Sequence, residues 1–150
     1  MHIRLTKLSD HRHRFEAARA DGSVEAAELE TRSLLVHDLT HYAVEAQARL
    51  DGGFYGLLAR GVALERLADA GWAGAPASLQ RVEALVGPMQ AVVGGSLPAQ
   101  RYVELAGDEA ITSAFVAGVV ERMRRLQGEW RALPYGQTMA LAWPPTDWER

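Results

Sequence analysis

The sequence predicts one α+β domain, in which a small antiparallel sheet packs against four to five helices. Apolar and polar residues alternate near both ends of the chain, which is the pattern of half-buried strands. Between these ends, apolar residues recur every three or four positions, as they do in helices that cover a core. The chain has 150 residues, of which 48% are hydrophobic and 23% charged. This length and composition fit a single domain over residues 1–150.

Three strands are expected at the N-terminus. In the first, Ile3 and Leu5 alternate with polar neighbours. The second runs from about Arg12 to Arg19 and the third from about Val24 to Glu30, and these two form a hairpin. A fourth strand is expected over Thr138–Trp143. We add it to the N-terminal sheet, because the backbone of a lone strand needs a hydrogen-bonding partner.

The hairpin turn is placed at residues 21–23, because Asp-Gly supplies the positive φ angles of a tight turn. A three-residue loop at these positions sets Phe15 opposite Leu29 and gives the sheet one apolar face. A two-residue loop would instead set Phe15 against Glu28. We therefore favour the three-residue loop.

The first long helix is expected from about Ser33 to Leu50. Residues 31–33 offer an N-cap, and Asp51-Gly52-Gly53 ends the helix because glycine suits the left-handed C-terminal position. The apolar positions form one stripe at helical spacing, made of Leu35, Leu39, Tyr42, Ala43, Ala46 and Leu50. The opposite side of this helix is polar.

Four further helical segments follow. Phe54 to Ala70 is typical of two short helices separated by a glycine, and Pro98 begins a short helix that reaches about Leu105. The longest helix is expected from about Glu109 to Trp130, with Asp108 as its N-cap. Another helix, which should bend or end near Pro88, carries the apolar residues Leu79, Val82, Leu85, Val86 and Met89.

Composition excludes several classes of function. With 16 Lys and Arg against 19 Asp and Glu, the net charge is −3, which gives nucleic-acid binding no support. The absence of cysteine excludes disulfides and thiolate metal sites and fits a reducing compartment. No segment resembles a signal peptide or approaches the roughly 18 apolar residues of a membrane span. We therefore expect a cytoplasmic protein without a membrane or nucleic-acid partner.

One segment of the chain suggests chemistry, and it consists of His37, Asp38, His41 and Glu45. At roughly 100° per residue, these four side chains fall within about 100° of one helix circumference. No Lys or Arg lies among them, whereas solvated helix faces usually mix carboxylates with cations that pair with them. We expect a polar site on this face, with a merely solvated face as the alternative.

The same four residues are a ligand set for a divalent metal. Two histidines one helical turn apart are the usual way in which a helix offers two ligands. Nitrogen and oxygen ligands favour zinc, iron, nickel or manganese over calcium, and zinc is our first choice. Asp38 would either bind the metal or hold an imidazole in place.

The segment resembles three families over a few residues each. His37, Asp38 and His41 are similar to the H-E-x-x-H motif of zincin metalloproteases, with Asp in place of the Glu that acts as general base. Residues 35–38 resemble a segment of the metal-dependent HD-domain phosphohydrolases, whose fold is all-helical. The H-D-x-x-H pattern also resembles a family of coenzyme-Q biosynthesis proteins, although Gly53 stands where that family has a later Glu. These matches are too short to assign a family.

Two other groups of residues offer candidate ligands. His11 and His13 point to the same face of a strand, and we interpret them as an exposed strand end. Arg122, Arg124 and Arg125 spread around the longest helix, and we interpret them as solvating it rather than holding a phosphate or carboxylate.

Two functions fit these observations, and no catalytic residue can be assigned. The first is a metal-dependent hydrolase, which uses its metal to activate water. The alternative is a non-catalytic ligand-binding or protein-interaction module, expected as a homodimer. A small-molecule ligand is the expected partner of the enzyme, whereas the module would bind a small ligand or a protein partner. A cleft above His37 would favour the enzyme, and a convex surface would favour the module.

Overall fold

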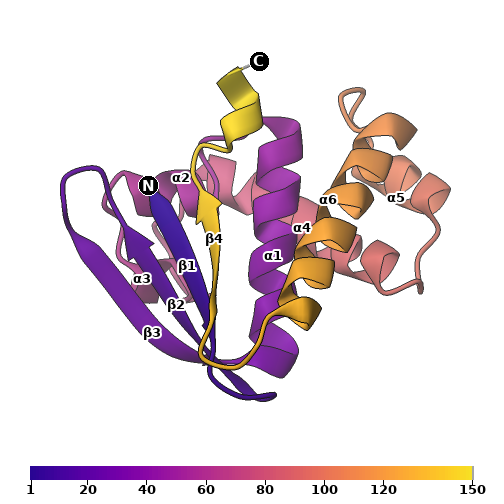
Figure 1. The fold of residues 1–150 in the computed structure, drawn as a ribbon. Helices are drawn as coiled ribbons and strands as arrows, with labels where there is room; N and C mark the ends of the chain where they lie inside the picture. The colour runs from indigo at the N-terminus through magenta and orange to yellow at the C-terminus, as the bar shows by residue number, and fades with distance from the viewer. Residues whose placement is uncertain (150) are drawn as a thin grey trace.

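Four antiparallel strands form a sheet that packs on the long helix α1, and other helices contact α1 on its remaining sides (Figure 1). The computed structural model describes the backbone of residues 1–149 and the side chains of residues 1–148. The strand order is β3-β2-β1-β4, so the C-terminal strand adds to the N-terminal sheet as predicted. The strands are β1 (His2–Lys7), β2 (Arg12–Ala18), β3 (Val24–Glu30) and β4 (Thr138–Ala142). The predicted α+β fold class is confirmed.

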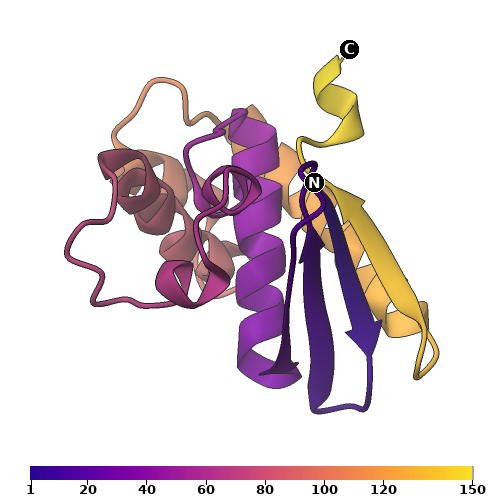
Figure 2. The same ribbon diagram turned by 90° about the vertical axis from the view of Figure 1, so that its left-hand side faces the viewer.

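The helices are α1 (Thr31–Ala48), α2 (Phe54–Ala59), α3 (Leu64–Leu67), α4 (Ala77–Val93), α5 (Ala99–Ala106) and α6 (Ser113–Ala132), followed by a short 3₁₀ turn, η1 (Thr146–Glu149). Figure 2 shows α1 standing between the sheet and the group formed by α2, α3 and α4. None of the helices described is long and apolar enough to cross a membrane.

The hairpin register differs by two residues from the predicted one. Phe15 pairs with Ala27 and not with Leu29. Because side chains in a strand alternate with a period of two, a shift by two residues leaves the same side chains facing the core. The error in register therefore did not disturb the predicted apolar face.

The cause of this shift lies in the hairpin loop, which covers residues 20–22 rather than 21–23. The Asp21 carboxylate accepts hydrogen bonds from the backbone N–H and the hydroxyl of Ser23, at 2.9 and 2.6 Å. Gly22 adopts the positive φ of 90° at the end of the turn. A turn that ends in one left-handed residue is a common three-residue hairpin loop, and the Asp-Gly pair therefore sits one position later in the loop than predicted.

Both ends of α1 differ from the prediction. Its N-cap is Glu30, whose carboxylate accepts hydrogen bonds from the N–H groups of Arg32 and Ser33, both at 2.9 Å. The helix therefore begins directly at the end of β3, with no loop between them. At its other end, Arg49 takes the left-handed conformation with a φ of 54°. The Leu50 N–H then reaches a carbonyl of the last turn, so the glycines that follow are not needed to end the helix.

Two later helices also have different bounds. Helix α4 runs through Pro88 to Val93. The carbonyl that Pro88 cannot bond belongs to Ala84, which is exposed, so water can satisfy it. Helix α6 begins after Thr112, whose hydroxyl accepts a hydrogen bond from the Phe115 N–H at 3.2 Å. Its predicted cap, Asp108, instead pairs with an arginine of α4.

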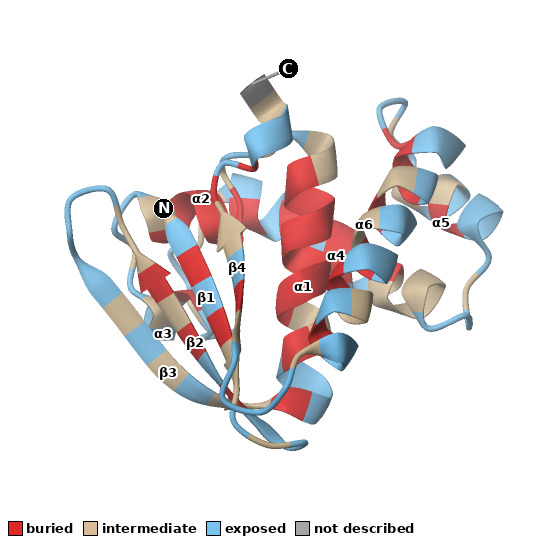
Figure 3. Ribbon diagram, viewed as in Figure 1, coloured by how far each residue is buried: buried red, intermediate tan, exposed pale blue. Residues whose placement is uncertain are grey.

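Helix α1 is buried on nearly all sides, as its colouring in Figure 3 shows. Every residue from Asp38 to Ala46 is buried. Leu35 and Leu39 belong to the core formed with the sheet, and α4 and α6 pack on other sides of α1. The face that carries His41 and Glu45 is therefore covered by protein. The alternative of a merely solvated face is therefore wrong for His41 and Glu45, whereas the His37 side chain is 39% exposed.

His13 is fully buried, so its interpretation as part of an exposed strand end is wrong. It shares the inner face of β2 with Phe15. Its Nδ1 lies 3.0 Å from the hydroxyl of Thr31, and its ring meets Trp130 edge-on. Burial lowers the pKa of His13, an effect that the nearby Glu30 carboxylate opposes. His11 lies before β2 and is exposed, as predicted.

We predict that His13 makes the fold sensitive to acid. Because its folded pKa lies below the unfolded value of 6.5, the unfolded chain binds protons more readily, and stability falls as the pH drops below about 6.5. The His13→Leu variant should lose less unfolding free energy between pH 7.5 and pH 5 than the wild type does, in urea titrations at each pH. The matched control is the exposed His11→Leu, which should behave as the wild type. Equal losses in the wild type and His13→Leu would contradict the prediction.

Candidate metal centre on the central helix

The centre of the candidate site is a hydrogen bond between two buried residues of α1. Nδ1 of His41 lies 3.0 Å from Oε2 of Glu45, one helical turn later. The side chains of the two residues are 1% and 0% exposed. When Glu45 is ionised, Nδ1 carries the proton and donates it to the carboxylate. The bond fixes the orientation of the imidazole and directs Nε2 away from Glu45.

The second oxygen of Glu45 is held by the start of α2. Its Oε1 accepts a hydrogen bond from the backbone N–H of Tyr55 at 3.1 Å. A Cβ at Gly53 would collide with this oxygen, so only glycine leaves room for the carboxylate. Burial raises the pKa of Glu45, whereas its hydrogen bond with His41 lowers it.

Glu83 of α4 faces the free nitrogen of His41. Its Oε1 lies 3.2 Å from Nε2, although the direction departs from that of a hydrogen bond. His37, one turn before His41, completes the group, because ligand atoms of His37, His41 and Glu83 all lie within 4.8 Å of one another. We call these three residues the ligand cluster. Two ligands of a tetrahedral zinc ion sit about 3.4 Å apart, so the spacing between His41 and Glu83 already suits one.

His37 lies at the outer side of the ligand cluster. Its side chain is 39% exposed, and its ring meets the His41 ring edge-on with 4.6 Å between their centres. Burial and the charge of His41 lower the pKa of His37, and Glu83 opposes them. Its imidazole is therefore neutral near pH 7, which is the form that binds a metal.

Asp38 is buried beside the ligand cluster but does not belong to it. Its carboxylate lies 3.9 Å from Nδ1 of His37, which is too long for a hydrogen bond. Burial raises the pKa of Asp38 to about 7, although the charge of His41 opposes this. Glu45 also lies outside the cluster, on the Nδ1 side of His41. Of the four residues predicted as ligands, the structure gathers the two histidines and adds Glu83.

The geometry around Nε2 of His41 calls for a cation. With the proton on Nδ1, Nε2 presents a lone pair toward an oxygen lone pair of Glu83 only 3.2 Å away. Within the described residues, Nε2 is one of two buried side-chain nitrogen or oxygen atoms without a hydrogen-bond partner. A buried polar atom without a partner is costly. Either a second proton on the imidazole or a metal ion between the two atoms removes the repulsion.

Without a metal, the proton is the favoured cation. Burial lowers the pKa of His41, but the contacts with Glu45 and Glu83 outweigh it and raise the pKa to about 9. The contact with His41 in turn lowers the pKa of Glu83. A divalent ion would balance the two carboxylates fully, because its charge of two matches one negative charge on Glu45 and one on Glu83.

Glu83 could not have been identified from the sequence. Its neighbours Val82, Leu85 and Val86 carry the apolar stripe of α4, and a glutamate between them is typical of any amphipathic helix surface. Its side chain is 45% exposed, as that pattern indicates. Only the packing of α4 across α1 brings it to His41.

Comparisons with protein-family models, with curated proteins and with solved structures found no match for the chain.

We predict that Gly53→Ala destabilises the fold by about 1–3 kcal/mol, because the added methyl group displaces the Glu45 carboxylate. Urea unfolding measures the change. The matched control is Gly128→Ala in α6, where a Cβ would meet nothing within 4 Å; it should stabilise the protein by about 0.5–1 kcal/mol. In a Glu45→Ala background, Gly53→Ala should cost clearly less. An equal cost in both backgrounds would mean that the carboxylate does not fill this space.

We also predict that the metal-free protein loses stability at alkaline pH. The pKa of His41 is raised from 6.5 to about 9 in the fold. The stability that comes from its imidazolium is therefore complete below pH 6.5 and disappears as the pH rises through about 9. Melting temperatures measured in chelator between pH 6 and pH 10 should fall for the wild type and fall less for His41→Gln. Parallel curves for the two proteins would contradict this account.

Proposed function

We propose that the protein binds a divalent transition metal ion through His37, His41 and Glu83, with zinc as the first choice. The observation that carries this proposal is the unpartnered Nε2 of His41, which faces Oε1 of Glu83 at 3.2 Å. Glu45 would not bind the metal itself. Its hydrogen bond to Nδ1 would orient the His41 imidazole and make Nε2 a stronger metal ligand. Such a carboxylate is the usual companion of a metal-binding histidine.

The ligand set suits catalysis better than a closed structural site. Two histidines and one glutamate are the protein ligands of several catalytic zinc sites, in which the fourth position holds water. His37 and Glu83 are 39% and 45% exposed, so a fourth position beside them is open to solvent. A metal in such a site lowers the pKa of its bound water and makes it a nucleophile near neutral pH. We therefore propose a metal-dependent hydrolase.

Asp38 is suited to a supporting role in this reaction. Its pKa of about 7 lets it exchange a proton near neutral pH, and it lies in the turn between the two histidines. A carboxyl group in this position could take a proton from the attacking water. Its backbone is held by Tyr55, whose hydroxyl donates a hydrogen bond to the Asp38 carbonyl at 2.8 Å.

The second candidate function is a non-catalytic binding module. It is favoured by the positions of two cavities among the described residues, neither of which is lined by the ligand cluster. One lies beside α3 and the other between α6 and β4. In that case the metal would stabilise α1 against α4 and the ligand would bind elsewhere.

We predict that zinc binds with one equivalent per chain and that its affinity depends on pH. Calorimetric titration of the protein without a histidine tag should show binding that weakens about 100-fold or more in His41→Ala and in Glu83→Gln. Because the metal displaces the second proton of His41, the affinity should rise roughly tenfold per pH unit between about pH 7 and 9. Glu121→Gln, on the exposed side of α6, is the matched control and should bind as the wild type.

Two outcomes of this titration would contradict the metal site. One is the absence of saturable binding in the wild type, and the other is equal binding in Glu83→Gln and Glu121→Gln. Hydrolysis is tested separately with 4-nitrophenyl acetate and bis(4-nitrophenyl) phosphate, in the presence of zinc or manganese. Turnover that needs metal and is lost in Glu83→Gln supports the hydrolase. Tight zinc binding without turnover of either compound supports the binding module instead.

A further inference from the structure

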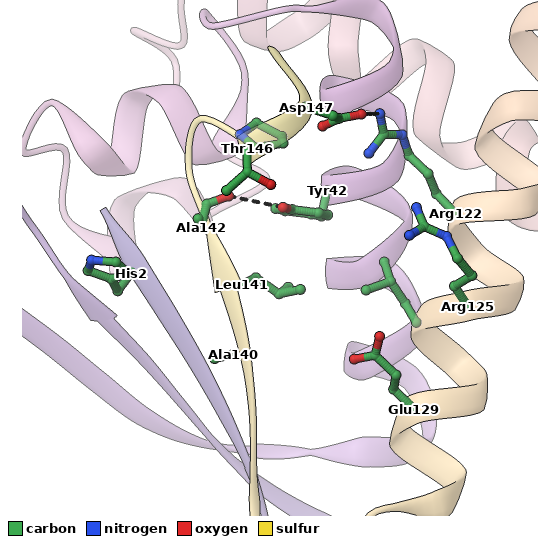
Figure 4. Close-up of a pocket in the computed structure, with 12 residues that line it drawn as sticks. His2, Tyr42, Arg122, Arg125, Glu129, Ala140, Leu141, Ala142, Thr146 and Asp147 are labelled. Carbon is green, nitrogen blue, oxygen red and sulfur yellow. Dashed lines mark hydrogen bonds and ion pairs between the residues drawn. The ribbon is translucent and has the colours of Figure 1, made fainter. Parts of the chain in front are cut away.

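A cavity of about 590 Å³ lies on another side of α1, between α6, β4 and the C-terminal segment (Figure 4). Its size falls in the range of small-molecule sites. It shares no residue with the ligand cluster. Tyr42 of α1 lines it, and the neighbouring His41 points toward α4 instead. The cavity and the ligand cluster are therefore separate places on α1.

Two arginines of α6, Arg122 and Arg125, line the cavity together with two carboxylates, those of Glu129 and Asp147. Figure 4 shows both arginine side chains directed toward α1. Arg122 is already engaged, because its Nε donates to Oε1 of Gln47 at 3.0 Å and its guanidinium pairs with the Asp147 carboxylate. Arg125 makes no hydrogen bond or ion pair with the other residues drawn. A guanidinium offers five donors, arranged to suit a carboxylate or a phosphate.

The rest of the cavity combines apolar surface with a few polar groups. Leu126, Leu141 and Pro145 line it together with the ring of Tyr42. The Tyr42 hydroxyl donates a hydrogen bond to the Ala142 carbonyl at 2.9 Å, which holds the ring in place. Burial raises the pKa of Tyr42 to about 12, while the charges of Arg122 and Arg125 oppose this. A few polar groups set among apolar ones are typical of a small-molecule site.

The edge of the sheet adds backbone donors. Strand β4 is an outer strand, and Met1 and Trp143 exchange two hydrogen bonds across to it, at 2.7 and 2.8 Å. Because backbone groups alternate along an antiparallel strand, the N–H groups of Ala140 and Ala142 point to the free edge. Both residues line the cavity, so their amides are available to a ligand.

We propose that this cavity binds a small organic anion, whose carboxylate or phosphate pairs with Arg125 while its apolar part lies against Leu126 and Leu141. Asp147 shows how such a group is recognised, because a carboxylate from the C-terminal turn already occupies Arg122. The anionic group of the ligand would lie beside the Asp147 carboxylate and form an ion pair with the guanidinium of Arg125.

The test is a titration followed by ¹H–¹⁵N NMR, with benzoate and phenyl phosphate as probes and benzamide as the neutral control. Saturable shifts should appear at the amides of Ala140 and Ala142 with both anions and not with benzamide. Arg125→Gln should weaken binding about tenfold or more. The matched control is Arg124→Gln, one position earlier in α6, where the arginine is exposed and paired with Glu121; this variant should bind as the wild type.

Two further readouts decide the nature of the anion and the role of Asp147. Phenyl phosphate binding more tightly than benzoate would identify a phosphate ligand, and the reverse order a carboxylate. Asp147→Asn releases Arg122 and should tighten binding of both anions about threefold or more. The proposal is overturned if neither anion gives saturable shifts, if benzamide binds as well as benzoate, or if Arg125→Gln binds as Arg124→Gln does. Unchanged binding in Asp147→Asn would contradict the placement of the anion beside Arg122.

Discussion

The hydrogen bond between His41 and Glu45 is the interaction on which the rest of the site depends. It lies inside α1, where the two side chains are 1% and 0% exposed. The second oxygen of Glu45 accepts a hydrogen bond from the Tyr55 N–H in the first turn of α2. Gly53 leaves the space that this carboxylate needs. When Glu45 is ionised, the same bond places a proton on Nδ1, and Nε2 is directed at Glu83. One carboxylate therefore joins two helices and prepares the site for a cation.

The position of α1 explains why these polar groups need one another. Because the helix lies between the sheet and α4, its polar face is removed from water and ionised groups there must be neutralised locally. A carboxylate alone in this position would be strongly destabilising. The chain of Glu45, His41 and Glu83 instead alternates negative, positive and negative charge when His41 is protonated. A metal ion at Nε2 would take over the role of that proton, which is why metal binding and protonation compete for the same atom.

The helices and strands follow from local patterns of apolar and polar residues. The sequence predicts an element well where such a pattern determines it without contacts from distant parts of the chain. The alternation of β1 and β4 and the apolar stripe of α6 each predicted an element that the structure contains. The hairpin register was missed because it depends on how Asp21 bonds within its loop, which the Asp-Gly pair does not reveal. The burial of His13 was missed because it depends on Trp130 of α6, more than a hundred residues away.

The candidate site likewise contains residues that the sequence pattern indicates and one residue that only the packing of helices brings in. The two histidines one helical turn apart were visible in the sequence, whereas Glu83 comes from a different helix and lies in an ordinary amphipathic pattern.

The most direct test of the account is NMR of ¹⁵N-labelled imidazoles near pH 7, with and without one equivalent of zinc. We expect His41 to carry two protons without zinc. With zinc, it should keep the Nδ1 proton while Nε2 shifts to a metal-bound position. A His41 spectrum that zinc leaves unchanged, or a metal bound at Nδ1, would contradict the account.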